Sequence, residues 1–113
     1  SATPLKGLIL CDPLGYMESL NLWKDAAVVV TDSGGLQEET TALNVPCLTI
    51  RKSTERPITS DVGSNVIIGS DNQKLGTMFD KALRGKWKES TVPLLWDGKA
   101  SERIVDTTIL NFL

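Results

Sequence analysis

The feature that most constrains the fold of this chain is an uninterrupted apolar run, AAVVV at 26–30, which Thr31 closes. A strand of an antiparallel sheet usually alternates apolar and polar residues, because one of its faces meets water. A strand that is apolar on both faces is typical of a parallel sheet with helices on both sides. The run 26–31 therefore predicts an α/β fold that contains a buried strand.

Apolar runs and amphipathic segments alternate along the rest of the chain. The predicted strands are 7–12, 26–31, 45–50 and 65–70, and the predicted helices are 16–25, 35–44, 72–85 and 99–113. The stretch 51–64 is predicted to be a loop with one helical turn after Pro57, and 86–98 to be irregular. This order is typical of a Rossmann-like parallel sheet with flanking helices. Doubly wound sheets usually have about five or six strands, so we expect residues 1–113 to form a single, truncated domain.

Composition excludes several classes of function. The chain contains no histidine, so a Ser-His-Asp triad, a Cys-His pair and a histidine metal site cannot be built from it alone. The formal charge is −2 with both signs scattered, and there is neither a basic stripe nor an apolar run of about 20 residues. We therefore expect no nucleic-acid partner and no membrane partner.

Two features bear on the cellular compartment. The N-terminal stretch SATPLKG lacks the pattern of a signal peptide. Cys11 and Cys47 lie in or beside predicted strands, where a free cysteine usually behaves as a small buried apolar residue, and a disulfide between them is not expected. These features favour a cytoplasmic protein.

The turn TDSGG at 31–35 directly follows the apolar run. In open α/β sheets, ligands bind at the carboxyl ends of the strands, where the next helix begins. The first N–H groups of a helix favour an anion, and glycine lets a phosphate approach without a Cβ in between. One interpretation is a diphosphate on the amides of Ser33, Gly34 and Gly35, with the Ser33 hydroxyl as a further donor. The other is a tight turn in which Ser33 or Asp32 only caps the helix.

Charged residues at two further places bear on ligand binding. Glu38 and Glu39 lie about one turn into the predicted helix, and at ~100° per residue Glu39 is the nearer to the side of Gly35. A carboxylate there can accept from ribose hydroxyls, or it can only offset the helix dipole. Arg56, in the TERP motif at 54–57, can pair with phosphate or sugar oxygens, or it can be exposed without a ligand.

Several motifs together resemble one family in their order and spacing. They are PLGY at 13–16, TDSGGLQEE at 31–39, VPCLTIR at 45–51, TERPITSDVGSN at 54–65, GS at 69–70 and DGKASERIV at 97–105. The set resembles the non-hydrolysing UDP-N-acetylglucosamine 2-epimerases, specifically the C-terminal half of their two-domain, glycosyltransferase-B-like architecture. The resemblance covers residues 8–106, and DSGGLQEE with TERP is far more specific than either motif alone.

The resemblance implies a reaction and a set of contacts. Members of that family interconvert UDP-GlcNAc and UDP-ManNAc for envelope and capsule polysaccharides, by eliminating UDP to leave an unsaturated sugar and adding it back with C2 inverted. By resemblance, Ser33, Gly34 and Gly35 contact the diphosphate. Glu39 matches the ribose-binding acid, and Arg56 matches an active-site arginine near the diphosphate and sugar. The resemblance implies no metal and no cofactor.

The chain also departs from the family pattern. The family's acid-base carboxylates lie on an N-terminal domain, and a functional histidine lies early in the C-terminal half; this chain has neither. We therefore expect it to contain no catalytic residue, to bind UDP or a UDP-sugar, and to depend on the missing N-terminal domain for epimerisation. Ser19 stands where the family commonly has an aromatic residue near the uracil.

Two alternatives stay open at this point. A nucleotide-sugar glycosyltransferase has a C-terminal domain of the same architecture with a similar Gly-rich turn, although TERP argues against it. A non-catalytic binding or interaction domain could keep the same motifs as scaffold. Exposed apolar surface is expected where partner elements belong, and it favours a homo-oligomer.

Overall fold

The computed structural model describes residues 6–112; residues 1–5, within the stretch SATPLKG, and Leu113, at the end of the predicted helix 99–113, lie outside it. Three strands, β1 (Val29–Thr31), β2 (Cys47–Thr49) and β3 (Asn65–Ile67), form one sheet in the order β1-β2-β3. β2 pairs in parallel with both neighbours. The three predicted strands that contain these segments are confirmed, each with a shorter hydrogen-bonded core.

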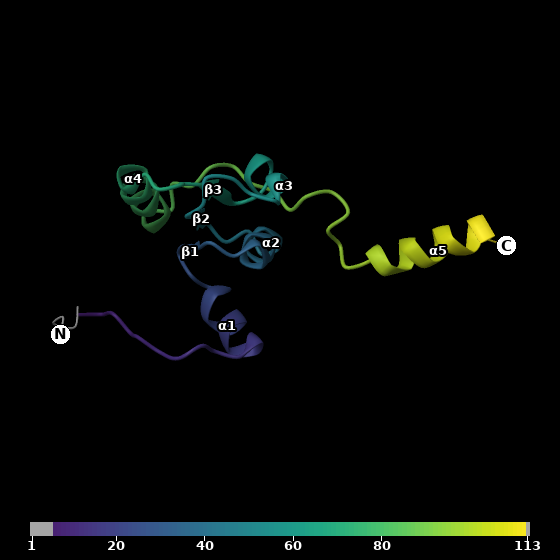
Figure 1. Cartoon of the computed structure of the whole chain (residues 1–113), viewed down its shortest axis with the longest axis horizontal. Coiled ribbons are helices and arrows are strands. Elements are labelled where there is room, and N and C mark those ends of the chain that lie inside the picture. The colour runs from purple at the N-terminus through teal and green to yellow at the C-terminus, as the bar shows by residue number, and fades with distance from the viewer. Residues whose placement is uncertain (1–5, 113) are drawn as a thin grey trace.

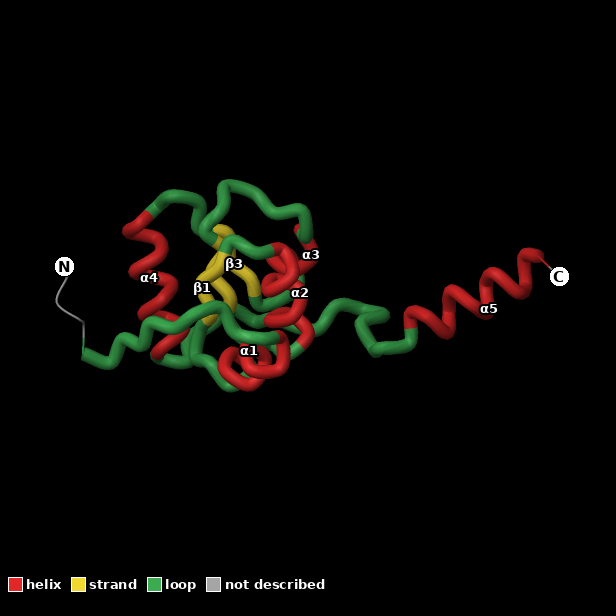
Figure 2. Tube along the Cα trace, turned by 60° about the horizontal axis from the view of Figure 1, so that its bottom comes forward, coloured by secondary structure: helices red, strands yellow, loops and turns green. Residues whose placement is uncertain are grey.

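Helices cover both sides of this sheet. α2 (Gly34–Ala42) connects β1 to β2, and α3 (Pro57–Asp61) forms the predicted helical turn between β2 and β3. α4 (Asn72–Leu83) follows β3 and contacts β2 from the side opposite to α2 and α3, as Figures 1 and 2 show. The Rossmann-like α/β architecture is confirmed.

Burial is greatest in the middle strand and lower at the edge. Cys47, Leu48 and Thr49 of β2 are each 0% exposed, whereas Val30 of β1 is 43% exposed. The prediction that the run 26–31 is buried on both faces is therefore wrong at Val30. Since β1 is an edge strand of the described sheet, fewer neighbours surround its side chains.

The predicted strand 7–12 is wrong. The segment is irregular, Leu8, Ile9 and Leu10 are 54%, 85% and 87% exposed, and it does not join the three-stranded sheet. An apolar sequence becomes a strand only when its backbone N–H and C=O groups find a neighbouring strand. The segment leads into α1 and lies apart from the sheet in Figure 1. Cys11 is exposed, and only Cys47 is a buried thiol.

The first and last helices are confirmed, with different packing. α1 (Tyr16–Trp23) buries Trp23, which is 8% exposed. α5 (Ala100–Phe112) projects away from the sheet in Figure 1, beyond the irregular stretch 86–98 that was predicted. Its amphipathic pattern is present, but apolar residues such as Ile104 and Leu110 are 64% and 82% exposed.

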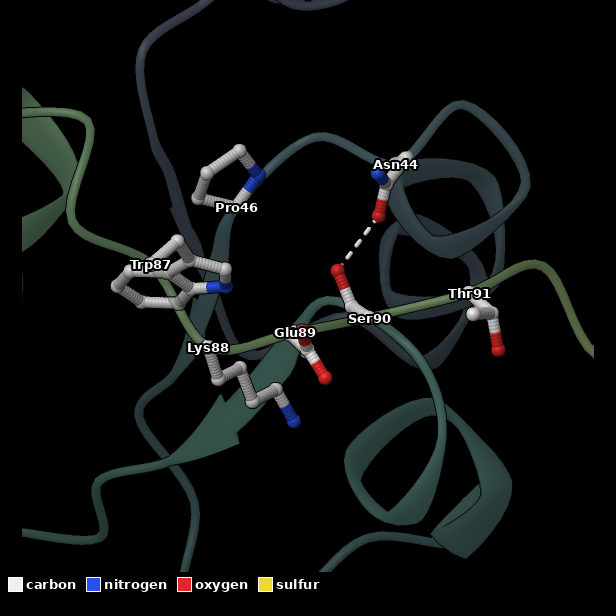
Figure 3. Close-up of a pocket in the computed structure, with 7 residues that line it drawn as sticks. All are labelled: Asn44, Pro46, Trp87, Lys88, Glu89, Ser90 and Thr91. Atoms are coloured by element: carbon white, nitrogen blue, oxygen red, sulfur yellow. Dashed lines mark hydrogen bonds between the residues drawn. The ribbon is translucent and has the colours of Figure 1, made fainter.

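The start of the stretch 86–98 crosses the amino ends of the strands (Figure 3). Trp87 donates from Nε1 to the carbonyl of the residue before β3, at 2.9 Å. Lys88 donates from Nζ to the carbonyls of Ser60 and Asn65, both at 2.6 Å. Burial lowers the pKa of the Lys88 ammonium below its ordinary value of 10.5.

The lowered pKa of Lys88 makes the free energy of unfolding depend on pH. Between the lowered pKa of Lys88 and 10.5, the unfolded chain binds more protons than the folded chain, so the free energy of unfolding rises with pH. Relative to the Lys88→Met variant, the wild type should therefore gain stability in urea unfolding as the pH rises from the lowered pKa of Lys88 towards 10.5. The exposed neighbour variant Lys86→Met should keep the wild-type dependence. If the difference in unfolding free energy between the wild type and Lys88→Met stays constant or falls as the pH rises, the lowered pKa of Lys88 is contradicted.

Candidate functional site

The predicted phosphate turn joins β1 to α2 at the carboxyl edge of the sheet. The Ser33 N–H donates to the Thr31 hydroxyl at 3.0 Å, and the Ser33 hydroxyl accepts from the N–H of Leu36 at 3.5 Å. Ser33 is thus the N-cap, and α2 begins at Gly34. Because the first N–H groups of a helix have no intrahelical acceptor, those of Gly34 and Gly35 are the donors at this end of α2.

The two glycines are not required by the fold itself. A Cβ built on Gly34 would meet no atom within 4 Å, and one built on Gly35 would meet only the Ser33 hydroxyl oxygen, at 3.8 Å. Neither residue has the positive φ that favours glycine. The open space beside both backbones is what a diphosphate would need in order to approach the amides.

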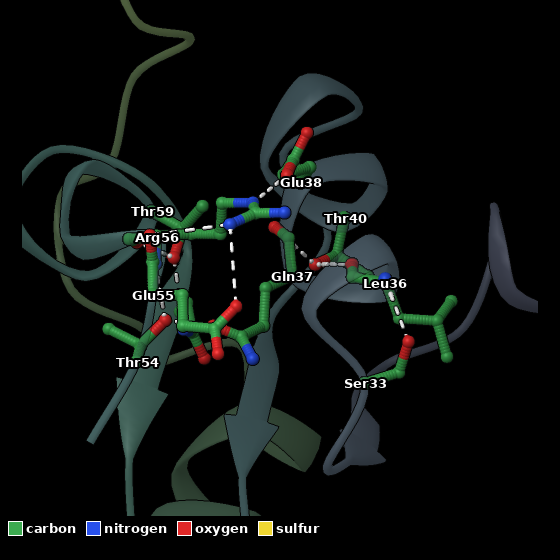
Figure 4. Close-up of polar contacts among 10 residues, drawn as sticks. Ser33, Leu36, Gln37, Glu38, Thr40, Thr54, Glu55, Arg56 and Thr59 are labelled. Carbon is green, nitrogen blue, oxygen red and sulfur yellow. Dashed lines mark hydrogen bonds and ion pairs between the residues drawn. The ribbon is translucent and has the colours of Figure 1, made fainter.

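Arg56 lies against α2 rather than alone in solvent. Its Nε donates to Glu38 Oε1, and its Nη1 lies 3.8 Å from Glu55 Oε2 (Figure 4). The hydrogen bond and charge of Glu38 raise the pKa of the Arg56 guanidinium. The side chains of Arg56 and Glu38 are 43% and 42% exposed, so both keep contact with solvent and with any ligand that approaches α2.

Glu39 faces a different neighbour from Glu38. It lines a pocket of about 270 Å³ between α1 and α2, together with Tyr16, Leu20, Trp23, Ala42 and Leu43. Adjacent helical residues point about 100° apart, which separates the two carboxylates in this way. The structure therefore brings Arg56 to Glu38 and leaves Glu39 beside an apolar pocket.

Sequence reasoning missed the two buried amides beneath Arg56. Gln37 and Asn65 are 1% and 0% exposed and hydrogen-bond each other, although they lie 28 positions apart. Gln37 resembles any polar helix residue, and Asn65, at the start of an apolar run, resembles a turn residue. Only the hydrophobic neighbours of Asn65 gave any indication that it would be inside.

A second hollow lies at the opposite, amino edge of the sheet. It measures about 620 Å³ and is lined by Asn44, Pro46, Trp87, Lys88, Glu89, Ser90 and Thr91 (Figure 3). None of the predicted site residues lines it. Within residues 6–112, no cluster of three or more His, Cys, Asp or Glu side chains could hold a metal ion. No helix in that range is both long and apolar enough to cross a membrane.

Known proteins match nearly the whole chain. The family model for UDP-N-acetylglucosamine 2-epimerase matches residues 2–109. The UDP-N-acetylglucosamine 2-epimerase of Methanocaldococcus jannaschii is 43% identical over 102 residues, which are 88% of this chain and 27% of that protein. The corresponding protein of Methanococcus maripaludis is 51% identical over 75 residues, which are 66% of this chain and 20% of that protein. The chain thus spans roughly a quarter of the length of these relatives.

Solved structures agree with the sequence matches. The M. jannaschii UDP-GlcNAc 2-epimerase in complex with UDP-GlcNAc and UDP has a TM-score of 0.72 at 42% identity, over 88% of this chain and 27% of that chain. The Neisseria meningitidis enzyme bound to UDP-GlcNAc has a TM-score of 0.73 at 30% identity, over 89% and 29%. Sequence motifs, fold and family model point the same way: the chain belongs to the UDP-N-acetylglucosamine 2-epimerase family.

Proposed function

We propose that this chain is the UDP-binding part of an enzyme that interconverts UDP-GlcNAc and UDP-ManNAc by eliminating and re-adding UDP. One observation carries the proposal: the open helix N-terminus at Gly34 and Gly35 belongs to α2, and the guanidinium of Arg56 lies against the same helix, since it pairs with Glu38. Family membership and the ligands of the M. jannaschii relative support the choice of nucleotide.

The proposed site treats UDP as both ligand and leaving group. The diphosphate would lie on the Gly34 and Gly35 amides and the Ser33 hydroxyl, where the helix dipole and Arg56 offset its charge. Elimination breaks the bond between sugar C1 and a diphosphate oxygen, and that bond's electron pair stays on UDP. The same donors therefore hold the leaving group more strongly than the intact substrate. The C2 proton goes to a base outside this chain. On re-addition a proton from an acid outside this chain is delivered to the opposite face of C2, and UDP restores the C1–O bond.

Glu39 is the proposed contact to the ribose. Its carboxylate lies beside the apolar pocket between α1 and α2, so a nucleoside there could place its hydroxyls on the acid and its base against apolar side chains. The exposure of Tyr16, 65%, supports an opening of this pocket to solvent. Glu38 forms an ion pair with Arg56, which supports Glu39 and not Glu38 as the ribose contact.

We also propose that the chain works within a larger assembly. The exposed apolar residues of the segment 8–10 and of α5 support contact with the remainder of an epimerase, or with a second copy. The described sheet and its helices would form one nucleotide-binding unit of it. The two free thiols, Cys11 and Cys47, are compatible with a reducing cytoplasm, where we place the protein.

Nuclear magnetic resonance titration tests this function. In the ¹⁵N-labelled chain, UDP and UDP-GlcNAc should shift the amide signals of Gly34 and Gly35, and ADP at the same concentration should shift them less. If Glu39 accepts from the ribose, 2′-deoxy-UDP should bind about 10- to 150-fold more weakly than UDP, the loss expected for one hydrogen bond to a charged group. The chain alone should not convert UDP-GlcNAc. Sustained conversion would overturn the proposal that the acid-base residues lie outside this chain. The absence of a shift with any nucleotide would favour a non-catalytic scaffold.

A further inference from the structure

Four polar side chains from four different elements meet beneath Arg56. They are Gln37 of α2, Thr49 of β2, Thr59 of α3 and Asn65 of β3, and each is at most 1% exposed. Burying a polar group without a hydrogen bond is costly, so a buried set of this kind persists only when its members satisfy one another. We refer to these four residues, with Thr54 of the TERP motif, as the Gln37–Asn65 network.

The network closes a ring of hydrogen bonds around the backbone of Arg56. Figure 4 labels four members of this ring, Gln37, Thr54, Arg56 and Thr59. The Arg56 N–H donates to the Thr54 hydroxyl at 2.9 Å, and that hydroxyl donates to Gln37 Oε1 at 2.5 Å. Asn65 Nδ2 donates to the same Gln37 oxygen at 3.2 Å and to the Thr59 hydroxyl at 3.1 Å. The Thr59 hydroxyl then donates to the Arg56 carbonyl at 2.7 Å.

Every group in the ring has a hydrogen-bond partner. Asn65 Oδ1 accepts from the Thr49 hydroxyl at 2.5 Å, which leaves both Nδ2 hydrogens for the ring. Each ring hydroxyl accepts one bond and donates one. Because a buried polar group without a partner is costly, these bonds favour one arrangement of the Arg56 backbone.

That arrangement matters because the backbone of Arg56 is in no regular element. It precedes Pro57 as the N-cap of α3, with φ −124° and ψ 63°, and its own side chain makes no capping bond. Its guanidinium reaches Glu38, one position along α2 from Gln37. The residue is thus tied to α2 twice, through its backbone by the ring and through its side chain by the ion pair.

We propose that the Gln37–Asn65 network consists of positioning residues that hold Arg56 in place for a diphosphate at the N-terminus of α2. The proposal rests on the proposed function. The network touches no ligand itself; Gln37 links it to the helix whose first turn would bind the phosphates. Removing one ring hydroxyl should therefore weaken diphosphate binding without removing any ligand contact.

The first test needs no ligand. Thr54→Val removes the ring hydroxyl at constant volume, and Thr54→Ser keeps it as the matched control. In Thr54→Val the Arg56 amide should exchange its hydrogen with solvent about 10-fold faster than in the wild type, and in Thr54→Ser at the wild-type rate. Equal Arg56 exchange rates in all three proteins would overturn the ring. Thermal unfolding of the variants verifies that each is folded.

The second test is a double-mutant cycle on UDP affinity. Thr54→Val should weaken UDP binding about 10-fold in the wild type and by less than about twofold in Arg56→Ala, because the ring acts only through that arginine. Uridine, which has no phosphate, should bind all variants alike. A Thr54→Val loss of the same size in both backgrounds would overturn the positioning role.

The two tests separate failure of this proposal from failure of the proposed function. If the wild-type chain binds no UDP, the proposed function falls and the positioning role falls with it, whatever the Arg56 exchange rates. If UDP binds and Arg56→Ala weakens it, but Thr54→Val does not, only the positioning role is overturned. Recovery of wild-type affinity in Thr54→Ser supports it.

Discussion

Replacing Gly35 by valine is expected to weaken UDP binding by about 100-fold while the chain stays folded. A Cβ at this position meets only the Ser33 hydroxyl, at 3.8 Å, so the fold has room for the new side chain. The same side chain occupies the space through which a diphosphate would reach the amides at the start of α2. Losing hydrogen bonds between charged phosphate oxygens and those amides costs about 1.5 to 3 kcal/mol, which corresponds to roughly 10- to 150-fold in affinity.

The measurement is a UDP titration of the wild type and the Gly35→Val variant by calorimetry. Gly76→Val is the matched control, because Gly76 is also a helical glycine whose Cβ position is open, and it lies in α4. That variant should bind UDP like the wild type. Wild-type affinity in Gly35→Val would show that the diphosphate does not use this end of α2.

Replacing Gly63 by alanine should destabilise the fold by about 3 kcal/mol, the upper end of typical overpacking costs. A Cβ there would lie 2.5 Å from Thr41 Cγ2, 2.7 Å from Thr41 Oγ1 and 2.7 Å from the carbonyl oxygen of Thr59. Thr41 is 0% exposed, and because both of its γ atoms face Gly63, rotation of the side chain leaves one of them against the new methyl group. The Thr59 carbonyl belongs to the backbone of α3, which cannot move away without moving the helix.

Urea unfolding of both proteins gives the difference directly. Gly76→Ala is the control, for which a change of opposite sign in the unfolding free energy is expected. In the interior of α4, replacing glycine by alanine should stabilise the fold by about 0.5 to 1 kcal/mol, because it limits the freedom of the unfolded chain. An unfolding free energy of Gly63→Ala within about 0.5 kcal/mol of the wild type would mean that α3 moves away from α2 more easily than its packing indicates.

Most elements of this fold could be predicted from local sequence. Apolar runs located β1, β2 and β3, and Pro57 located the short α3, because these signals act over a few residues. The segment 7–12 carried the same apolar signal and formed no strand. Strand formation depends on a neighbour elsewhere in the sequence, and a local pattern contains no information about whether that neighbour is present.

The candidate site was predictable in part for the same reason. The turn at Ser33, Gly34 and Gly35 lies within one short motif, so its position after β1 followed from the order of elements. The pairing of Arg56 with Glu38 joins residues 18 positions apart, and neither position alone indicated which of two adjacent acids would be used. The bond between Gln37 and Asn65 spans 28 positions.

The sequence by itself determined the α/β class, the start of α2 at a glycine turn and the family, because apolar periodicity, capping residues and motif spacing are all local or ordered along the chain. Only the tertiary structure decided that Glu38 holds Arg56, that Glu39 faces the pocket beside α1, and that buried amides surround the Arg56 backbone. Each of these depends on how far α2 is rotated about its axis and on the close approach of segments that the chain separates. Side-chain packing over the whole sheet sets both the rotation of α2 and the approach of these segments, so neither follows from a local pattern.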